Sequence, residues 1–321
     1  MSPADRSRRR FLLQAGGTLT AVAAGCATSS APASASGILD THTHFYDPHR
    51  PQGVPWPSPS DRLLYRPVLP AEYKSLARPL GITGTIVVEA SPWPGDNQWI
   101  LDLAAHEPFI TGFIGNLKPG TPDFPKLLDR FARNPLFRGI RIGGDTLNAA
   151  LSGGDVRAHL EQLAERRLVL DVLIGPDQLP DVATVADRIR GLPFIVDHLS
   201  NVPISKPPHP NRWVSGMAAC HYVDNVFMKF SGYVEGTGAR GGTAPKDPAP
   251  YRPVIDTAWR IFGEDRLIFG SNWPVSAEFA SLSTVVQLAR DFLEPHGPEA
   301  LKKVLHDNAT RIYRPVARRS T

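Results

Sequence analysis

The segment "ILDTHTHF", residues 38–45, begins with apolar residues and ends in two histidines that are one residue apart. Successive side chains of a β-strand point to opposite faces, so Asp40, His42 and His44 share one face. In barrels of parallel strands, the carboxyl ends of the strands carry the functional residues. The segment therefore predicts the first strand of a barrel, with both imidazoles directed into its open end.

Seven further apolar runs follow, rich in Val and Ile and bounded by Gly, Pro, Asn or Asp, which is typical of strands buried on both faces. They cover residues 84–90, 110–117, 139–143, 168–174, 192–198, 226–232 and 266–272. The segments between them have helical spacing, as in "VRAHLEQLAERR" (156–167). Eight such units predict a single-domain α/β fold, the (β/α)8 TIM barrel. A doubly wound sheet is the alternative, but no G-x-G-x-x-G follows the first run.

Long Pro- and Gly-rich segments follow three of the predicted strands, at residues 47–79, 200–213 and 235–250. In a barrel, loops in these positions gather at the carboxyl ends of the strands, where substrates bind. Their length favours a covered pocket.

The first 35 residues have the pattern of an export signal. "SRRRFLL" (7–13) resembles the twin-arginine motif, and the apolar stretch after it is too short and too rich in Gly and Ala for a stable membrane span. Ala33-Ser34-Ala35 offers a cleavage site, whereas a lipobox-like sequence before Cys26 would make that residue a lipid anchor. We expect a signal over residues 1–35, a barrel over 36–315 and a tail over 316–321, with the twin-arginine export machinery as a partner and a periplasmic product.

The composition argues against a nucleic-acid partner. Of the net charge of +4, the first ten residues hold four arginines and one aspartate, which leaves +1 for the rest of the chain. After cleavage at Ala35 one cysteine remains, Cys220, so no internal disulfide can form. We expect Cys220 to be a small buried side chain in a helix.

Two more predicted strands end in polar residues, His198 in "FIVDHLS" (194–200) and Asn272 in "IFGSNWP" (268–274). Together with the first-strand "HTH" and the terminal "DNATRIY" (307–313), these motifs resemble the amidohydrolase-related family. Within it, the chain is most similar to the lactonase branch of 2-pyrone-4,6-dicarboxylate lactonase and the sugar lactonases. "FRGIRI", "DVL" and "KFSG" fit the same pattern.

The resemblance implies hydrolysis at a carbonyl carbon, with His42, His44 and His198 converging on the carbonyl oxygen or on a metal. In this family the eighth strand supplies an aspartate that takes a proton from the attacking water, and here Asn272 stands in its place. An amide has no basic form near neutral pH, although it can hold a water molecule or donate to an oxyanion.

Three interpretations of Asn272 stay open. One divalent metal ion, with zinc expected, could be held by His42, His44 and His198 and generate its own nucleophile. A histidine could act as the base in a metal-free mechanism, or the site could bind without turnover. A second metal is not expected, because the fourth run offers no Lys or Glu ligand and the fifth ends without a histidine.

Other side chains are candidates for contacts with the substrate. Arg141, inside the fourth run, either pairs with Glu89 or Asp171 or binds a substrate carboxylate or carbonyl. The same two roles are open to Lys229, and Glu89 could replace the missing aspartate. Aromatic residues near the strand ends would bind a ring-shaped substrate or fill the barrel rim; they are Tyr46, Trp56, Trp93 and Trp273.

We therefore expect an exported hydrolase that opens a lactone or related cyclic ester of a small organic acid or sugar. Its catalytic residues would be His42, His44, His198 and Asn272. A metal-dependent decarboxylase of aromatic acids and a non-catalytic binding protein are the alternatives on the same barrel.

Overall fold

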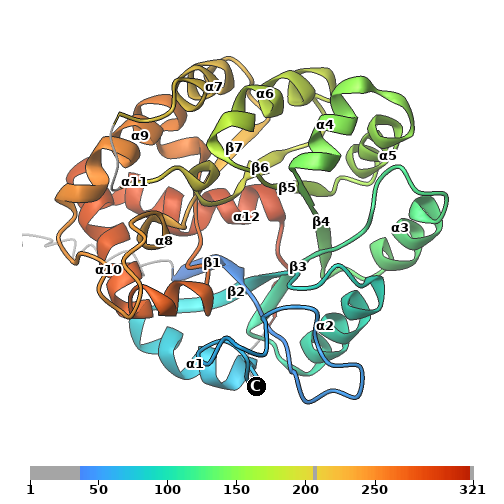
Figure 1. Ribbon diagram of the computed structural model, residues 1–321, viewed down its shortest axis with the longest axis horizontal. Helices are drawn as coiled ribbons and strands as arrows, with labels where there is room; N and C mark the ends of the chain where they lie inside the picture. Colours follow the sequence, from blue (N-terminus) through green and yellow to red (C-terminus); the bar gives the residue numbers. More distant parts are fainter. Residues whose placement is uncertain (1–36, 205–207, 319–321) are drawn as a thin grey trace, which may run out of the picture. The chain divides into compact units, whose positions relative to one another are not determined.

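The computed structural model describes residues 37–204 and 208–318. Eight parallel strands follow one another around a single sheet in the order of the chain, with helices between them (Figure 1). The predicted (β/α)8 fold is confirmed, and each of the eight apolar runs overlaps one strand, although β2 and β4 begin two residues before the predicted runs. The strands are β1 (Ile38–Thr43), β2 (Ile82–Val88), β3 (Ile110–Gly115), β4 (Phe137–Gly143), β5 (Val169–Leu173), β6 (Phe194–Val196), β7 (Val226–Phe230) and β8 (Leu267–Phe269).

Contacts between the first and last strands close the sheet into a barrel. Thr41 Oγ1 donates to the carbonyl of Phe269, the last residue of β8, at 2.7 Å. Thr43 pairs with Trp273 as a parallel bridge, and the amide of His44 donates to Trp273 O at 2.9 Å. The segment after β8 is thus held against the residues that carry the first-strand histidines.

The helices surround the barrel and turn their apolar sides toward it. In α10, the residues Leu282, Val285, Ala289 and Phe292 are buried at helical spacing, and Ser281 Oγ accepts from the amide of Thr284 at the helix start. The helices are α1 (Pro70–Ala77), α2 (Pro94–His106), α3 (Phe124–Ala132), α4 (Gly144–Ser152), α5 (Gly154–Glu165), α6 (Leu179–Arg188), α7 (Asn211–His221), α8 (Tyr233–Gly236), α9 (Arg252–Arg266), α10 (Leu282–Leu293), α11 (Pro298–Lys302) and α12 (Asn308–Tyr313).

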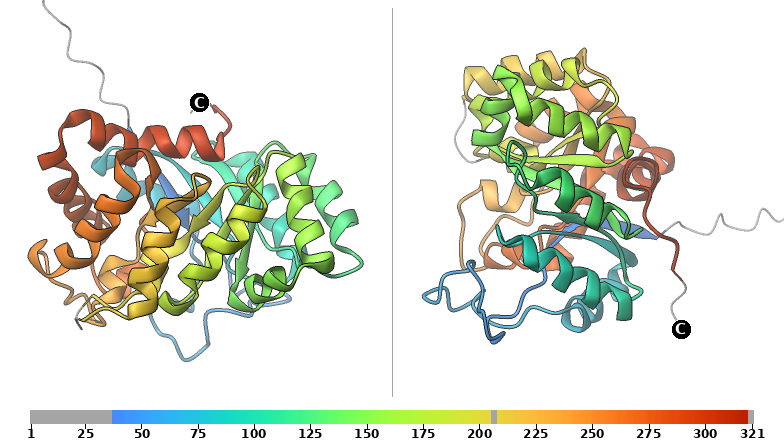
Figure 2. Two further views of the ribbon diagram at one scale, coloured as in Figure 1. Left: turned by 90° about the horizontal axis from the view of Figure 1, so that it is seen from above. Right: turned by 90° about the vertical axis from the view of Figure 1, so that its right-hand side faces the viewer.

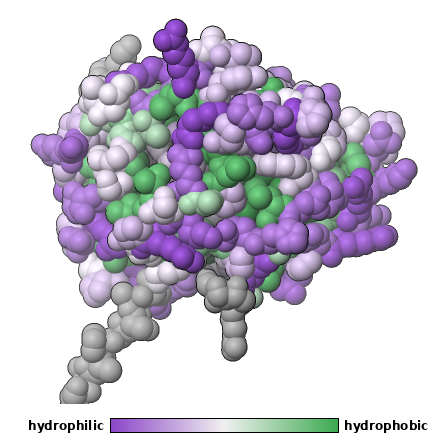
Figure 3. Space-filling model, turned by 90° about the horizontal axis from the view of Figure 1, so that it is seen from below, coloured by the Kyte–Doolittle hydropathy of each residue, from purple (hydrophilic) through white to green (hydrophobic). Residues whose placement is uncertain are grey.

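The outer surface agrees with this arrangement. On the face seen from below (Figure 3), hydrophilic side chains surround several patches of apolar side chains. Within the described residues, no helix is both long and apolar enough to cross a membrane. Cys220 is fully buried in α7, as expected.

The last helix closes the barrel at the amino ends of its strands. Buried strand residues, among them Leu39, Ile114 and Ile268, form a cluster inside the barrel. Three buried residues of α12 complete this cluster: Ala309, Ile312 and Tyr313. Asn308 Nδ2 donates to the carbonyl of Leu267, the first residue of β8, at 2.9 Å. In Figure 2, the loop after β1 lies on the side opposite α12. That long loop therefore lies at the open, carboxyl end.

The predicted export signal and the lipid-anchor alternative at Cys26 lie outside the described residues and stay predictions. The boundary of the barrel at residue 315 is likewise a prediction. Beyond it, the amide of Val316 donates to Thr111 O at 2.8 Å, which places the start of the predicted tail against β3.

Candidate active site

The two histidines of the first strand lie together at the open end of the barrel. His42 is fully buried and His44 is 4% exposed, and their ring centroids are 4.9 Å apart. His44 Nδ1 lies 2.9 Å from the carbonyl of Val88. Because a carbonyl only accepts, Nδ1 carries the proton and Nε2 keeps a free lone pair. His42 and His44 lie together as predicted, but Asp40, expected on the same face, accepts a hydrogen bond from Tyr73 of α1 on the helix side of the strand. The register of β1 against β2 is irregular between Asp40 and Thr43, which breaks the alternation of side chains.

His198 joins this pair from the sixth strand, with its ring centroid 4.4 Å from that of His42. It lies two residues beyond the end of β6, in a run of four non-glycine residues, 198–201, whose φ values lie between +53° and +57°. Each left-handed residue costs about 1–2 kcal/mol. Such strain is common at functional sites, where the surrounding contacts enforce it.

Two neighbours fix the imidazole of His198. Its Nδ1 lies 2.9 Å from Ser231 Oγ. Gly232, with φ +68°, packs so closely that a Cβ there would lie 2.4 Å from His198 Cβ. The position after Ser231 therefore requires glycine, both for its backbone conformation and for the space that His198 occupies.

Lys229 lies beneath the histidines and binds two buried carboxylates. Its Nζ contacts an oxygen of Asp171, lies 3.1 Å from Asp197 Oδ1 and 3.0 Å from His42 Nδ1. Lys229, Asp171 and Asp197 have no solvent exposure. Tyr313 Oη also donates to Asp171 at 2.9 Å, from the opposite end of the barrel. Of the two roles predicted for Lys229, the structure thus shows a buried ion pair.

These surroundings keep the three imidazoles neutral. Burial, together with the charge of Arg141, lowers the pKa of His44 to about 3, and burial lowers that of His198 to about 4. Burial and the charge of Lys229 hold the pKa of His42 well below its usual value. Burial alone would raise the pKa of Asp197, but the charge of Lys229 lowers it well below its usual range, so this carboxylate stays ionised.

The ligand atoms of His42, Asp197 and His198 lie within 4.8 Å of one another and suit a divalent cation. Among the described residues, His42 Nε2 is buried without a hydrogen-bond partner, and the two oxygens of Asp197 have ion-pair contacts with Lys229 at 3.1 Å and Arg141 at 3.9 Å but no hydrogen bond. A bound ion would satisfy such atoms. Nitrogen and carboxylate ligands at a strand end therefore fit a divalent metal. Among the described residues His44 is not part of this group, so its predicted role as a ligand stays a prediction.

Arg141 and Glu89 form an ion pair on the wall of the site. Arg141 Nε donates to Glu89 Oε1 at 2.7 Å, and a second nitrogen donates to the Glu89 carbonyl at 2.8 Å. Glu89 Oε2 accepts from the amide of Ser91 at 2.8 Å. The partner predicted for Arg141 is thus Glu89, whereas Asp171 binds Lys229.

Asn272 lies three residues beyond the end of β8, with φ +57°, and is 5% exposed. Its Nδ2 donates to Glu235 Oε1 at 2.8 Å. Burial raises the pKa of Glu235 to about 7, against the hydrogen bond from Asn272. The residue that replaces the family's aspartate is thus bonded to a different carboxyl group, supplied by α8.

An open cavity of about 850 Å³ connects these groups to the solvent. Polar and aromatic side chains from several strand ends line it: His44, Trp56, Glu89, Ser91, Asn116, Arg141, His198 and Asn272. It therefore combines groups able to bind a substrate with two of the three converging imidazoles.

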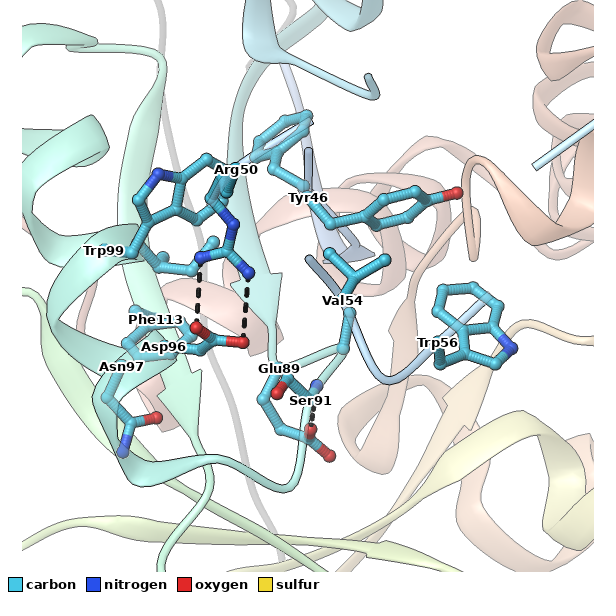
Figure 4. A pocket seen from close by; sticks show the side chains of 13 residues that line it. Tyr46, Arg50, Val54, Trp56, Glu89, Ser91, Asp96, Asn97, Trp99 and Phe113 are labelled. Atoms are coloured by element: carbon cyan, nitrogen blue, oxygen red, sulfur yellow. Dashed lines mark hydrogen bonds and ion pairs between the residues drawn. The ribbon is translucent and has the colours of Figure 1, made fainter. Parts of the chain in front are cut away.

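A second, much narrower cavity adjoins the first under the loop after β1 and shares Trp56, Glu89 and Ser91 with it. Figure 4 shows Arg50 paired with Asp96 on one side of this cavity and Trp56 on the other. Arg50 also lies over the ring of Trp99, 4.5 Å from its centroid.

The structure separates the predicted aromatic contacts. Tyr46 lines the smaller cavity, and its hydroxyl donates to Leu64 O at 2.9 Å. Trp273 is 2% exposed and packs against Tyr73 at 5.1 Å between ring centroids. Trp93 is 39% exposed and precedes α2. Neither tryptophan is among the residues that line the two cavities, and their substrate contacts stay predictions.

Sequence analysis did not assign roles to Asp197, Glu235 and Ser231. Asp197 stands next to His198 in the "DHL" motif, and this adjacency was the available signal. Ser231 follows Lys229 by two residues and so shares its face. Glu235 has no such signal, because it lies in a loop-rich segment and is placed by the fold of α8.

A closed parallel barrel with imidazoles and a buried carboxylate at the carboxyl ends of its strands has the architecture of (β/α)8 hydrolases. The amidohydrolase family model matches residues 39–314. The chain therefore belongs to the amidohydrolase family and is a hydrolase, as the motifs predicted.

Three similar proteins illustrate this membership. An L-fucono-1,5-lactonase of Burkholderia ambifaria is 30% identical over 86% of this chain and 95% of its own length. One of Burkholderia multivorans is 27% identical over the same shares. The crystal structure of a zinc-bound amidohydrolase from Burkholderia multivorans has a TM-score of 0.79 at 25% identity and covers 87% of this chain and 99% of its own.

Proposed function

We propose that this hydrolase opens a lactone of a polyhydroxylated acid, such as a sugar lactone. The observation that supports this most strongly is the convergence of neutral His42, His44 and His198 beside an 850 Å³ cavity. The chain that forms this site is 30% identical to an L-fucono-1,5-lactonase.

We also propose that the site uses one divalent metal ion, with zinc expected, held by His42, Asp197 and His198. Such an ion would polarise the substrate carbonyl and make a bound water more acidic. To offer Nε2 to such an ion, His42 would carry its proton on Nδ1, which lies 3.4 Å from Asp197 Oδ1 and 3.0 Å from Lys229 Nζ. Binding would therefore require Lys229 to direct its N–H groups to Asp171 and Asp197 and away from His42.

The other side chains bind and orient the reactants. The free lone pair of His44 Nε2 faces the group of imidazoles and accepts a hydrogen bond from water or from a substrate hydroxyl. Arg141 is fixed by Glu89 and presents its remaining N–H groups to the carbonyl or ring oxygen of the lactone. Asn272 holds the attacking water on the cavity wall.

The charge of the cavity favours a neutral lactone over a dicarboxylate. Among its lining residues, Arg141 is the one Arg or Lys side chain, and Glu89 neutralises it. Two buried substrate carboxylates would each need a compensating cation. Ser91, Asn116 and Glu89 instead offer hydrogen bonds to hydroxyl groups, and Trp56 offers a flat surface for a sugar ring.

A lactone panel at constant pH tests the proposal. Opening a lactone forms a carboxylic acid, so base consumption should match substrate loss, and His198→Ala should lower kcat/KM at least about 100-fold. His221→Ala, at an exposed position on α7, is the matched control and should not change it.

Two other results would contradict hydrolysis. Release of carbon dioxide from aromatic acids, which consumes a proton, would identify the decarboxylase instead. Binding of lactones without turnover, in protein supplied with zinc, would identify a binding protein.

We further propose export to the periplasm through the twin-arginine route, on the pattern "SRRRFLL". Changing both Arg8 and Arg9 to lysine should keep the protein in the cytoplasm, as measured by cell fractionation. An unchanged periplasmic fraction would contradict this route. Labelling with a radioactive fatty acid that is lost in Cys26→Ser would show that the product is a lipoprotein.

A further inference from the structure

The amide of Asn272 has a fixed direction. Its Nδ2 donates to Glu235 Oε1 at 2.8 Å, and an amide nitrogen donates but does not accept. The two branches of the amide point apart, so this bond leaves Oδ1 for the cavity that Asn272 lines. An oxygen in that place accepts a hydrogen bond from water.

Glu235 is a half-buried residue whose contact with Asn272 is the main polar interaction of its carboxyl group. Its Oε2 is buried and has no hydrogen-bond partner among the described residues, where no lysine or arginine pairs with it either. The ionisable groups near Glu235 add no positive charge. They are Tyr233, Tyr251 and Glu278, and Glu278 forms an ion pair with Arg240. Desolvation of an unpaired carboxyl group costs free energy, and a carboxyl group kept in such surroundings beside a cavity is a candidate for a functional role.

We propose that Glu235 is a positioning residue for the hydrolytic site: it binds Asn272 Nδ2 and thereby turns Asn272 Oδ1 toward the attacking water. This role rests on the lactonase function proposed above. The water is held in the orientation for attack on the carbonyl carbon, and Glu235 itself does not contact the reacting atoms.

The pair also explains why residue 272 is an asparagine. An aspartate there would place a second carboxyl group within hydrogen-bond distance of Glu235, without a nearby cation. Two such carboxyl groups cannot both ionise and would share one proton. Given a carboxyl group at residue 235, an amide at residue 272 is the matching partner. Asn272 therefore preserves the site, because the pair still consists of one carboxyl group and one amide.

Four variants test the pair, each measured for thermal unfolding and for kcat and KM on the best lactone. Glu235→Met removes the acceptor and should lower kcat by about 10- to 100-fold with little change in KM, because a misplaced reacting group costs up to about 100-fold. Glu235→Gln should recover much of this loss, since its amide oxygen still accepts from Asn272. Glu165→Met, at an exposed site, is the matched control.

The exchange variants give the decisive comparison. Asn272→Asp alone creates the carboxyl pair and should lower kcat, whereas Asn272→Asp combined with Glu235→Gln restores one carboxyl and one amide and should recover at least 10-fold of that loss. A purely structural role would give equal recovery in unfolding temperature without recovery in kcat, and that result would overturn the positioning role.

The unfolding measurements also separate this inference from the proposed function. Additive effects of the two substitutions on unfolding would overturn the pair itself, whether or not lactones react. A wild-type protein that is inert toward every lactone would overturn the proposed function and, with it, the role of Glu235 in the reaction. Non-additive effects in both unfolding and kcat support the inference.

Discussion

Replacing Lys229 by Met removes the ammonium group that pairs with both buried carboxylates, Asp171 and Asp197, and leaves Asp197 only the contact of its Oδ2 with Arg141 at 3.9 Å. The ammonium group touches Asp171 and lies 3.1 Å from Asp197, and all three side chains are buried. Breaking a buried ion pair by removing one partner costs about 3–5 kcal/mol, because the other charge stays buried and unpaired. We therefore expect the free energy of unfolding to fall by about that amount.

Urea unfolding followed by tryptophan fluorescence measures this loss. Lys302→Met is the matched control: its ion pair with Asp307 lies on the surface, so it should have little effect on the unfolding midpoint. Combining Lys229→Met with Asp171→Asn should recover part of the stability, since an amide needs no counter-charge and can still accept from Tyr313. A loss below about 1 kcal/mol for Lys229→Met, or strictly additive effects of the two changes, would refute the reasoning.

Three further predictions concern the site. Gly232→Ala should displace His198 and lower kcat/KM, because the added Cβ would lie 2.4 Å from His198 Cβ. Gly241→Ala is the matched control and should lower kcat/KM less, since its added Cβ has no neighbour within 4 Å. Equal losses in the two variants would contradict this reasoning. Folding raises the pKa of Glu235 from 4.5 to about 7, so the folded state binds the proton of this carboxyl group more tightly than the unfolded state does. The contribution of Glu235 to the free energy of unfolding is therefore complete below pH 4.5 and is lost as the pH rises to about 7. The loss is about 3 kcal/mol, and the difference in unfolding free energy between wild type and Glu235→Gln across this range measures it; a constant difference would exclude it. Chelation should abolish turnover and release metal that mass spectrometry detects, and Asp197→Asn should lower the amount bound; full activity of metal-free protein would show that the imidazoles act alone.

The sequence was sufficient for the fold because every strand is buried on both faces and therefore appears as a continuous apolar run. It also predicted that His42 and His44 converge with His198, since strand parity and the common open end of a barrel fix which residues meet.

Contacts between side chains of distant strands were harder to predict. Arg141 had two candidate partners, and register alone favours Asp171, which stands opposite it on β5. The structure pairs Arg141 with Glu89, because Lys229 reaches Asp171 first from β7. The left-handed turn at 198–201 has no glycine to indicate it, and the bond between Asn272 and Glu235 depends on how α8 folds back.

The position of α12 has a consequence for biosynthesis. Tyr313, in the last turn of this helix, donates its hydroxyl hydrogen to Asp171, which binds Lys229 near the histidines. A ribosome makes the chain from its amino end, so the eight strands emerge before the group that completes their inner charge network. A nascent chain that stops before residue 308 would have a complete sheet, but the barrel would be open at the amino ends of its strands and Asp171 would lack the hydrogen bond from Tyr313. Such a product would be a good substrate for proteases.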